Sequence, residues 1–140
     1  MKLSIKKMTL LFAALAVLLL VSIPADAQRR NSSRTSGGEL RNRIGKDGVI
    51  AVNGRIRYSI SLSQGQVVRV RVKAKNGDPA IGIIVSTNET SYGDRYKVGG
   101  TLEEDDNGTF WQGAVGATGT YYVYVFAPLS TTFRIRASAW

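Results

Sequence analysis

From Ile44 onward, apolar and polar residues alternate with a period of two along most of the chain. The clearest case is "VVRVRVKAK" at residues 67–75, in which Val68, Val70 and Val72 alternate with cationic residues. Successive side chains of a strand face opposite sides of a sheet. The stretch therefore predicts a strand with a core face and a solvent face. No stretch after Ile44 shows the period of a helix.

Turn residues divide this region into short segments. Asn-Gly pairs at 53–54, 76–77 and 107–108 supply residues that tolerate positive φ, and glycine does the same at 63–66 and 116–119. The expected strands are 48–53, 55–62, 66–74, 80–86, a weak one near 95–101, 109–115, 120–127 and 132–139. About eight short strands predict an all-β fold, a two-sheet antiparallel β-sandwich of jelly-roll type.

The first 27 residues have the pattern of a secretory signal peptide. Three lysines precede a 15-residue apolar run, and "PADAQ" then offers small residues on either side of a cleavage site. The run is shorter than the roughly 20 residues that a membrane span needs. We expect cleavage between Ala27 and Gln28, which would give a secreted or periplasmic protein. Mass spectrometry of the mature N-terminus would test this cleavage site.

Residues 28–43 contain five arginines and one aliphatic side chain, that of Leu40. Such a composition buries too little to offset the entropy of ordering, so it predicts a flexible basic arm. Residues 44–140 then form the sandwich domain. The chain has no cysteine, so this domain must fold without disulfides.

Net charge points to anionic partners. Without residues 1–27 the chain keeps 16 of its 19 cations and 9 of its 10 acids, a net charge of +7. A positive field attracts anionic surfaces and polymers without specificity. Solubility alone is the simpler explanation of such a charge.

The cations also have a pattern. The solvent faces of two expected strands, 66–74 and 132–139, together with Lys75 directly after the first, carry the six residues of a candidate anion-binding face: Arg69, Arg71, Lys73, Lys75, Arg134 and Arg136. Jelly-roll order makes these two strands neighbours inside one sheet. Cations two apart on a strand repel by about 0.6 kcal/mol in water. Because that cost is tolerable, the row is explained either by an anionic ligand or by ordinary solubilising charge.

A second row is aromatic. In "TYYVYVFA" at 120–127, placing Tyr121, Val123 and Val125 in the core leaves Tyr122, Tyr124 and Phe126 outside. Exposed aromatic residues on a sheet can stack on sugar rings or pack against a partner. With the opposite parity, the three would be core residues.

The acids gather in "EEDDNG" at 103–108, where Glu103, Glu104, Asp105 and Asp106 are consecutive. Carboxylate-rich loops can bind Ca²⁺, but this spacing matches no EF-hand loop. A solvated turn, a weak calcium site and a partner for the arginine arm all remain open.

Catalysis has little support in the sequence. Histidine and cysteine are absent, which removes the commonest general base, the thiol nucleophile and the usual zinc ligands. The glycine-rich "GAVGATG" at 113–119 leads into a strand rather than a helix, so it predicts a turn and not a phosphate loop. We expect no enzyme activity and no cofactor.

Three segments carry a family resemblance: "YSISLSQGQVVRVRV" at 58–72, "GATGTYYVYVF" at 116–126 and "TFRIRAS" at 132–138. Together they resemble the pre-peptidase C-terminal domain, a small jelly-roll sandwich of secreted bacterial proteins, over residues 49–138. The same pattern, with a strand like Trp111-Gln112-Gly113, is similar to periplasmic inhibitors of goose-type lysozyme.

The expected function is a secreted or periplasmic binding module without enzyme activity, for an anionic or carbohydrate polymer of the cell envelope. The resemblance implies an alternative, inhibition of a secreted hydrolase such as goose-type lysozyme. A structural accessory domain without a ligand is the third possibility. No specific nucleic-acid partner and no membrane span are expected.

Overall fold

The computed structural model describes residues 35–75 and 80–140. The expected leader, its cleavage site between Ala27 and Gln28, and the basic arm up to residue 34 lie outside the described residues. So does the Asn-Gly turn expected at 76–77.

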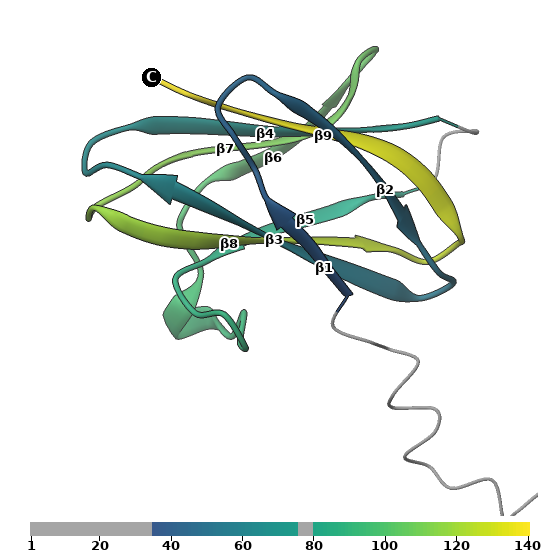
Figure 1. The fold of residues 1–140 in the computed structure, drawn as a ribbon, viewed down its shortest axis with the longest axis horizontal. Coiled ribbons are helices and arrows are strands. Elements are labelled where there is room, and N and C mark those ends of the chain that lie inside the picture. The colour runs from purple at the N-terminus through teal and green to yellow at the C-terminus, as the bar shows by residue number, and fades with distance from the viewer. Residues whose placement is uncertain (1–34, 76–79) are drawn as a thin grey trace, which may run out of the picture. The chain divides into compact units, whose positions relative to one another are not determined.

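In residues 35–75 and 80–140, nine strands form two sheets that face each other (Figure 1). The four-stranded sheet has the order β1 (Thr35–Glu39), β3 (Gly54–Leu62), β8 (Gly119–Ala127), β5 (Gly82–Ser86). The five-stranded sheet has the order β2 (Gly45–Ile50), β9 (Thr131–Ala139), β4 (Val67–Ala74), β7 (Gly108–Ala114), β6 (Thr101–Asp105). The predicted two-sheet β-sandwich is confirmed, while its finer jelly-roll assignment stays a prediction.

The core lies between the sheets and follows the predicted parity. Val70 and Val72 of β4, Val123 of β8, and Phe133 and Ile135 of β9 have no exposed surface. Strand β4 lies between β9 and β7, and β9 lies between β2 and β4. The two cation-bearing strands are therefore interior neighbours, as the sequence predicted.

Strand β1 was not expected, because it falls in the stretch predicted as a flexible arm. It pairs in parallel with β3, and Leu40 beyond it is buried. The Tyr58 side chain packs closely on β1 and on β2: a Cβ at Gly37 of β1 would lie 2.1 Å from its ring, and one at Gly48 of β2 would lie 2.4 Å from its hydroxyl. Only glycine allows both approaches, so the arm prediction is wrong from residue 35 onward.

The region that contains the weak expected strand and the acidic run also differs from the prediction. A 3-10 turn, η1 (Asp94–Tyr96), occupies part of the weak strand expected near 95–101. Strand β6 follows, pairs antiparallel with β7, and is exposed at all five positions. The run at 103–105 therefore lies on an edge strand rather than in a turn. Charged side chains on such an edge deter pairing with other chains.

Within the described part of the chain, no helix is long and apolar enough to cross a membrane.

Candidate functional site

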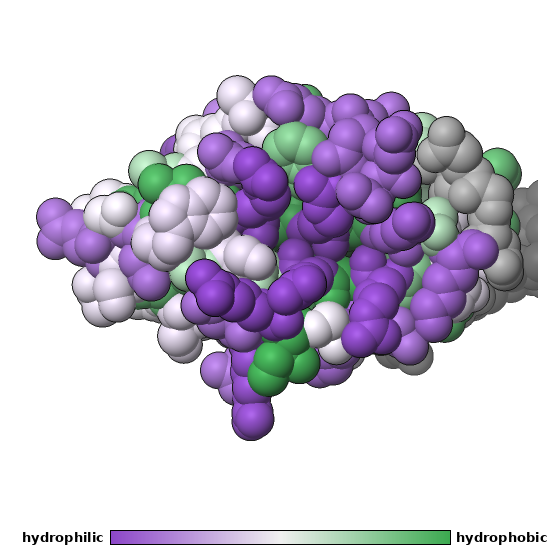
Figure 2. Space-filling view, turned by 90° about the horizontal axis from the view of Figure 1, so that it is seen from above, coloured by the Kyte–Doolittle hydropathy of each residue, from purple (hydrophilic) through white to green (hydrophobic). Residues whose placement is uncertain are grey.

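The candidate site is the outer face of the five-stranded sheet, seen from above in Figure 2. Hydrophilic side chains cover most of this face, and apolar surface is visible between them. Because the valines of β4 and the Phe133 and Ile135 side chains of β9 point into the core, the alternate residues of both strands must face outward.

Strand register places cations directly opposite cations. Arg71 of β4 pairs with Arg136 of β9, and Lys73 pairs with Arg134. Lys75 is level with Thr132, whose carbonyl accepts a hydrogen bond from the Lys75 backbone N–H at 2.8 Å. Residues directly opposite have Cβ atoms about 4.5–5.5 Å apart, and like charges in such positions are destabilising.

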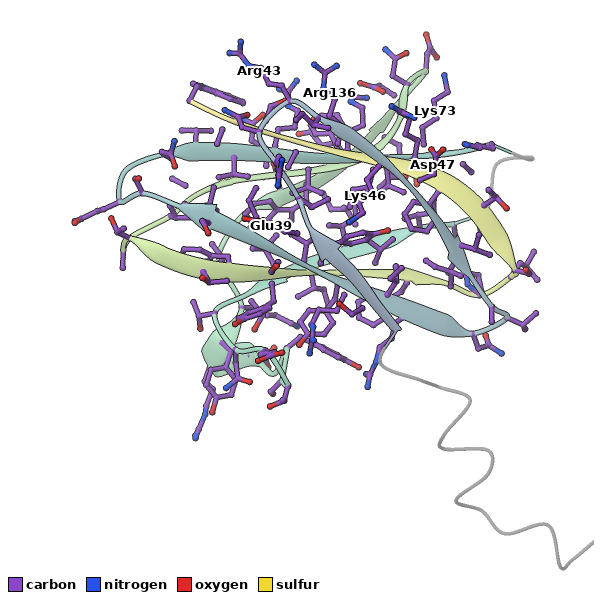
Figure 3. All side chains as sticks on the ribbon, in the orientation of Figure 1. Glu39, Arg43, Lys46, Asp47, Lys73 and Arg136 are labelled. Carbon is purple, nitrogen blue, oxygen red and sulfur yellow. The ribbon has the colours of Figure 1, made fainter. Side chains whose placement is uncertain are left out.

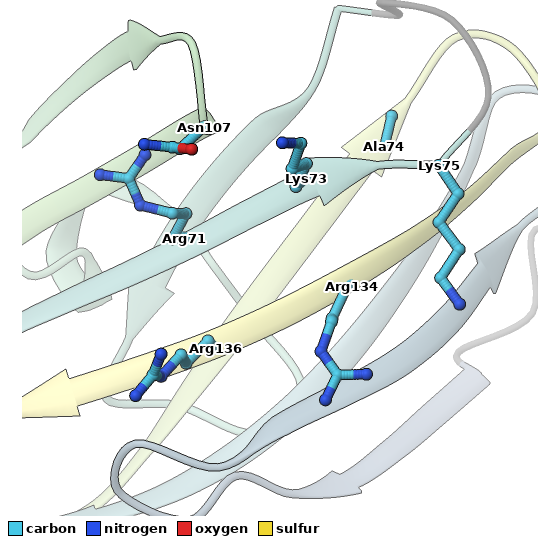
Figure 4. Close-up of a pocket in the computed structure, with 7 residues that line it drawn as sticks. All are labelled: Arg71, Lys73, Ala74, Lys75, Asn107, Arg134 and Arg136. Carbon is cyan, nitrogen blue, oxygen red and sulfur yellow. The ribbon is translucent and has the colours of Figure 1, made fainter.

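These side chains surround a shallow hollow of about 610 Å³ (Figure 4). Its lining consists of Arg71, Lys73, Ala74, Lys75, Asn107, Arg134 and Arg136. We call this hollow the cationic groove. Of the six predicted cations it brings together five, and Arg69 is not among the lining residues.

Arg69 and Arg71 pack on an aromatic ring beside the groove. Each guanidinium lies 4.8 Å from the ring centroid of Phe110, a residue that points outward from β7 but is only 8% exposed. Arg69 donates a hydrogen bond to Gln112, and Arg71 forms an ion pair with Asp105. The two arginines therefore cover an apolar ring that would otherwise face water.

Two carboxylates partly neutralise the groove. Asp47 of β2 lies 3.0 Å from the Lys75 ammonium and 3.3 Å from the Arg134 guanidinium. The hydrogen bond from Lys75 is the main cause that holds the pKa of Asp47 below its usual value. The hydrogen bond from Arg71 lowers the pKa of Asp105 in the same way. Both carboxylates are therefore ionised at neutral pH.

Lys73 and Arg136 differ from the other groove cations. Neither makes an ion pair with any residue in 35–75 or 80–140. Both side chains are exposed and belong to the two opposed pairs (Figure 3). They are the groove cations most available to an external anion.

The calcium hypothesis receives no support from the geometry. Alternation along β6 sends Glu103 and Asp105 to the face opposite that of Glu104, while Asp106 follows the strand. The described residues contain no cluster of three or more acidic side chains that could hold a metal ion. Asp105 pairs with Arg71 of the sheet, which gives this carboxylate another partner than the arm.

The outer face of the four-stranded sheet carries the aromatic row, and its predicted parity is confirmed by the burial of Tyr121, Val123 and Val125. The expected exposure is wrong for Tyr124, which is 4% exposed. The segment 87–97 lies over it: the Tyr92 ring is 5.0 Å from that of Tyr124 and 5.2 Å from that of Phe126. Tyr122 and Phe126 are half-buried.

Polar contacts hold this covering segment in place. The Tyr124 hydroxyl donates to the Glu89 carbonyl at 2.5 Å, and the Glu89 carboxylate lies 3.0 Å from Arg57. Arg55 donates to the Tyr92 hydroxyl at 2.7 Å. The remaining space among Arg57, Glu89 and Tyr124 is about 10 Å³, too small for a sugar ring.

Sequence reasoning missed two polar residues of the groove region. Asp47 lies on β2, and only the pairing of β2 with β9 brings it to Arg134. Asn107 belongs to an Asn-Gly turn that the sequence identified only as a turn. Its position beside the groove depends on the pairing of β7 with β4.

Solved structures of similar fold are known at low sequence identity. A periplasmic inhibitor of g-type lysozyme, PliG from Aeromonas hydrophila, is 19% identical, with a TM-score of 0.59, over 76% of this chain and 96% of that one. PliG from Salmonella Typhimurium is 16% identical, with a TM-score of 0.53, over 76% and 99% of the two chains. The pre-peptidase C-terminal domain of a Bacillus anthracis collagenase is 13% identical, with a TM-score of 0.51, over 75% and 96%.

These matches confirm the predicted resemblance at the level of fold. No protein-family model matches the chain, and neither does any functionally curated sequence. The fold and the site together describe a β-sandwich with one cationic sheet face and one face covered by a loop.

Proposed function

We propose that the protein is a non-enzymatic binding module, secreted or periplasmic, that holds an anionic polymer of the cell envelope in the cationic groove. The observation that carries the proposal is the direct opposition of Arg71 to Arg136 and of Lys73 to Arg134. An anion placed between opposed cations attracts both of them and so offsets their mutual repulsion.

The alternative of simple solubilising charge fits less well. Cations that protect a sheet from aggregation belong on its edge strands, whereas β4 and β9 are interior. Solubility is also served equally well by cations set apart from one another. The arrangement therefore favours a ligand over surface charge alone.

Binding should be tested by retention on heparin or another anionic polysaccharide, with elution by salt. Changing Lys73 and Arg136 to glutamine removes two groove charges that have no ion pair among residues 35–75 and 80–140. Changing Arg95 and Lys97 to glutamine removes two exposed charges from the segment over the other sheet. Net charge is then matched between the variants.

We expect the groove variant to elute at clearly lower salt, since a preorganised set of cations loses less side-chain entropy on binding than scattered ones. Arg69 and Arg71 are unsuitable for this test because they also cover Phe110. If the two variants elute together, retention reflects net charge and the proposal fails.

A second candidate function rests on the fold comparison. Several structures of similar fold are described as inhibitors of g-type lysozyme. Inhibition of such a hydrolase by this chain should be tested by adding the protein to a g-type lysozyme and following lysis of bacterial cell walls. Many lysozymes are basic, and like charges slow the encounter of two proteins. An unchanged rate of lysis with excess protein would exclude this candidate.

A further inference from the structure

One end of the sandwich exposes aliphatic side chains that no core or groove contact uses. The turn between β2 and β3 and the turn between β8 and β9 lie side by side there (Figure 1), joined by a hydrogen bond of 3.1 Å from Asn53 N–H to the Pro128 carbonyl. Val52 and Leu129 are each 62% exposed on these turns, and Val49 on the adjoining strand is 64% exposed. We call Val49, Val52 and Leu129 the aliphatic rim.

The aliphatic rim borders the cationic groove. Val49 of β2 pairs with Thr132 of β9, which is level with Lys75 of β4. The next row of solvent-facing residues, one step further from the turns along the same strands, consists of Asp47, Arg134 and Lys73. Along the sheet, away from the turns, the surface therefore changes from aliphatic to cationic within one row of residues.

From this order we infer that the aliphatic rim and the adjacent end of the cationic groove dock on the surface of an anionic lipid bilayer. Outward rows on a strand are nearly 7 Å apart. The headgroup layer of one leaflet is about 5–8 Å thick. With Val49 at the edge of the hydrocarbon, Lys75 in the same row lies at the base of the headgroups, and the row of Arg134 and Lys73 lies near their outer limit.

Charge complementarity selects this partner over an uncharged one. Exposed aliphatic residues scattered singly need no explanation, but here they border the end of the cationic groove that holds Lys75, Lys73 and Arg134. Asp47 is the one acid among these rows, and its two ion pairs offset its repulsion from lipid phosphates. The inference goes beyond the proposed function, since a soluble polymer would not need the aliphatic rim.

The test is cosedimentation of the exported protein with vesicles of phosphatidylglycerol and phosphatidylcholine in equal parts. We expect the wild type to pellet with these vesicles and to stay in solution with phosphatidylcholine alone. Changing Val52 and Leu129 to serine should lower the partition coefficient about tenfold, because two exposed aliphatic side chains lose their burial. Changing Lys73 and Lys75 to glutamine should lower it about tenfold as well.

The matched control changes Ile44 and Leu102 to serine. These residues are 58% and 50% exposed and lie outside the aliphatic rim, so the partition coefficient should change less than twofold. As a second measurement, the substitution Leu129→Trp should shift its emission to the blue on anionic vesicles. Trp140, at the far end of β9, provides no such reporter in the parent protein.

Two results overturn the inference. One is a wild type that stays in solution with anionic vesicles; retention on polysaccharide would then leave the proposed function standing. The other is a Val52 and Leu129 variant that binds like the wild type while only the lysine variant is weakened. Binding would then be electrostatic, without a part for the aliphatic rim.

Discussion

The two outer faces of the sandwich begin from the same pattern and end differently. On each, a strand with alternating valines or isoleucines directs arginines outward: Arg55 and Arg57 on β3, Arg69 and Arg71 on β4. Over β3 and β8 the segment 87–97 supplies Glu89 and Tyr92, which bind those arginines and bury Tyr124. Over β4 and β9 the described chain supplies no such cover, and the groove stays open.

The comparison teaches that alternation alone does not distinguish a binding face from a covered one. What decides is whether another segment of the chain brings groups that satisfy the outward side chains. The covered face should therefore contribute to stability, and the open face should respond to ligands.

The largest expected effect is on the covered face. Changing Tyr124 to serine should lower the free energy of unfolding by about 3 kcal/mol, because it removes a buried ring and its packing on Tyr92. A denaturant melt measures this. Changing exposed Lys73 to serine on the open face is the control, expected within about 0.5 kcal/mol. Equal losses for the two variants would contradict the assignment of a covered and an open face.

A smaller effect should separate two arginines of the open face. Arg71→Gln should cost about 1 kcal/mol, since the Phe110 ring loses part of its cover and Asp105 loses its ion pair. Arg136→Gln should cost nothing or stabilise slightly, because it relieves the opposition to Arg71. Paired melts at low salt measure the difference, and the reverse order would refute the described contacts.

An anion bound in the cationic groove of the open face should stabilise the folded protein. At equal ionic strength, sulfate should raise the melting temperature of the wild type by roughly 2–4 °C more than that of the variant with Lys73 and Arg136 changed to glutamine. Comparison with the variant is needed because sulfate stabilises most proteins through exclusion from their surfaces. The same sulfate increment in both proteins would mean that the groove holds no anion.

The smallest effect concerns acid. The pKa values of Asp47 and Asp105 are lowered by their cationic partners. Their contribution to stability is therefore present above the unfolded value of about 3.9 and is lost as the pH falls through the folded values. Melts at decreasing pH should show a shallower decline below about pH 4 in the Asp47→Asn and Asp105→Asn variants. An unchanged acid limb would show that these contacts contribute nothing.

Sequence reasoning predicted what depends on a period of two. It placed the valines of β4 and of β8 in the core and the cations of β4 and β9 on one face, because each strand carries its own pattern. It missed β1, since "TSGGE" has no apolar alternation and depends on Tyr58 far along the chain. The cover over Tyr124 was missed for a related reason, because segment 87–97 shows no pattern that indicates where it docks.

The position of β9 has a consequence for the order of events in folding. Strand β9 follows the other described strands along the chain, yet it lies between β2 and β4, near the centre of its sheet. During synthesis, β2 can join β4 through β9 only after residues 131–139 have been made. Non-local pairings of this kind make folding slow. Truncation before Thr131 should therefore leave β2 and β4 without their shared partner, so that the C-terminal strand acts as the closing step of folding.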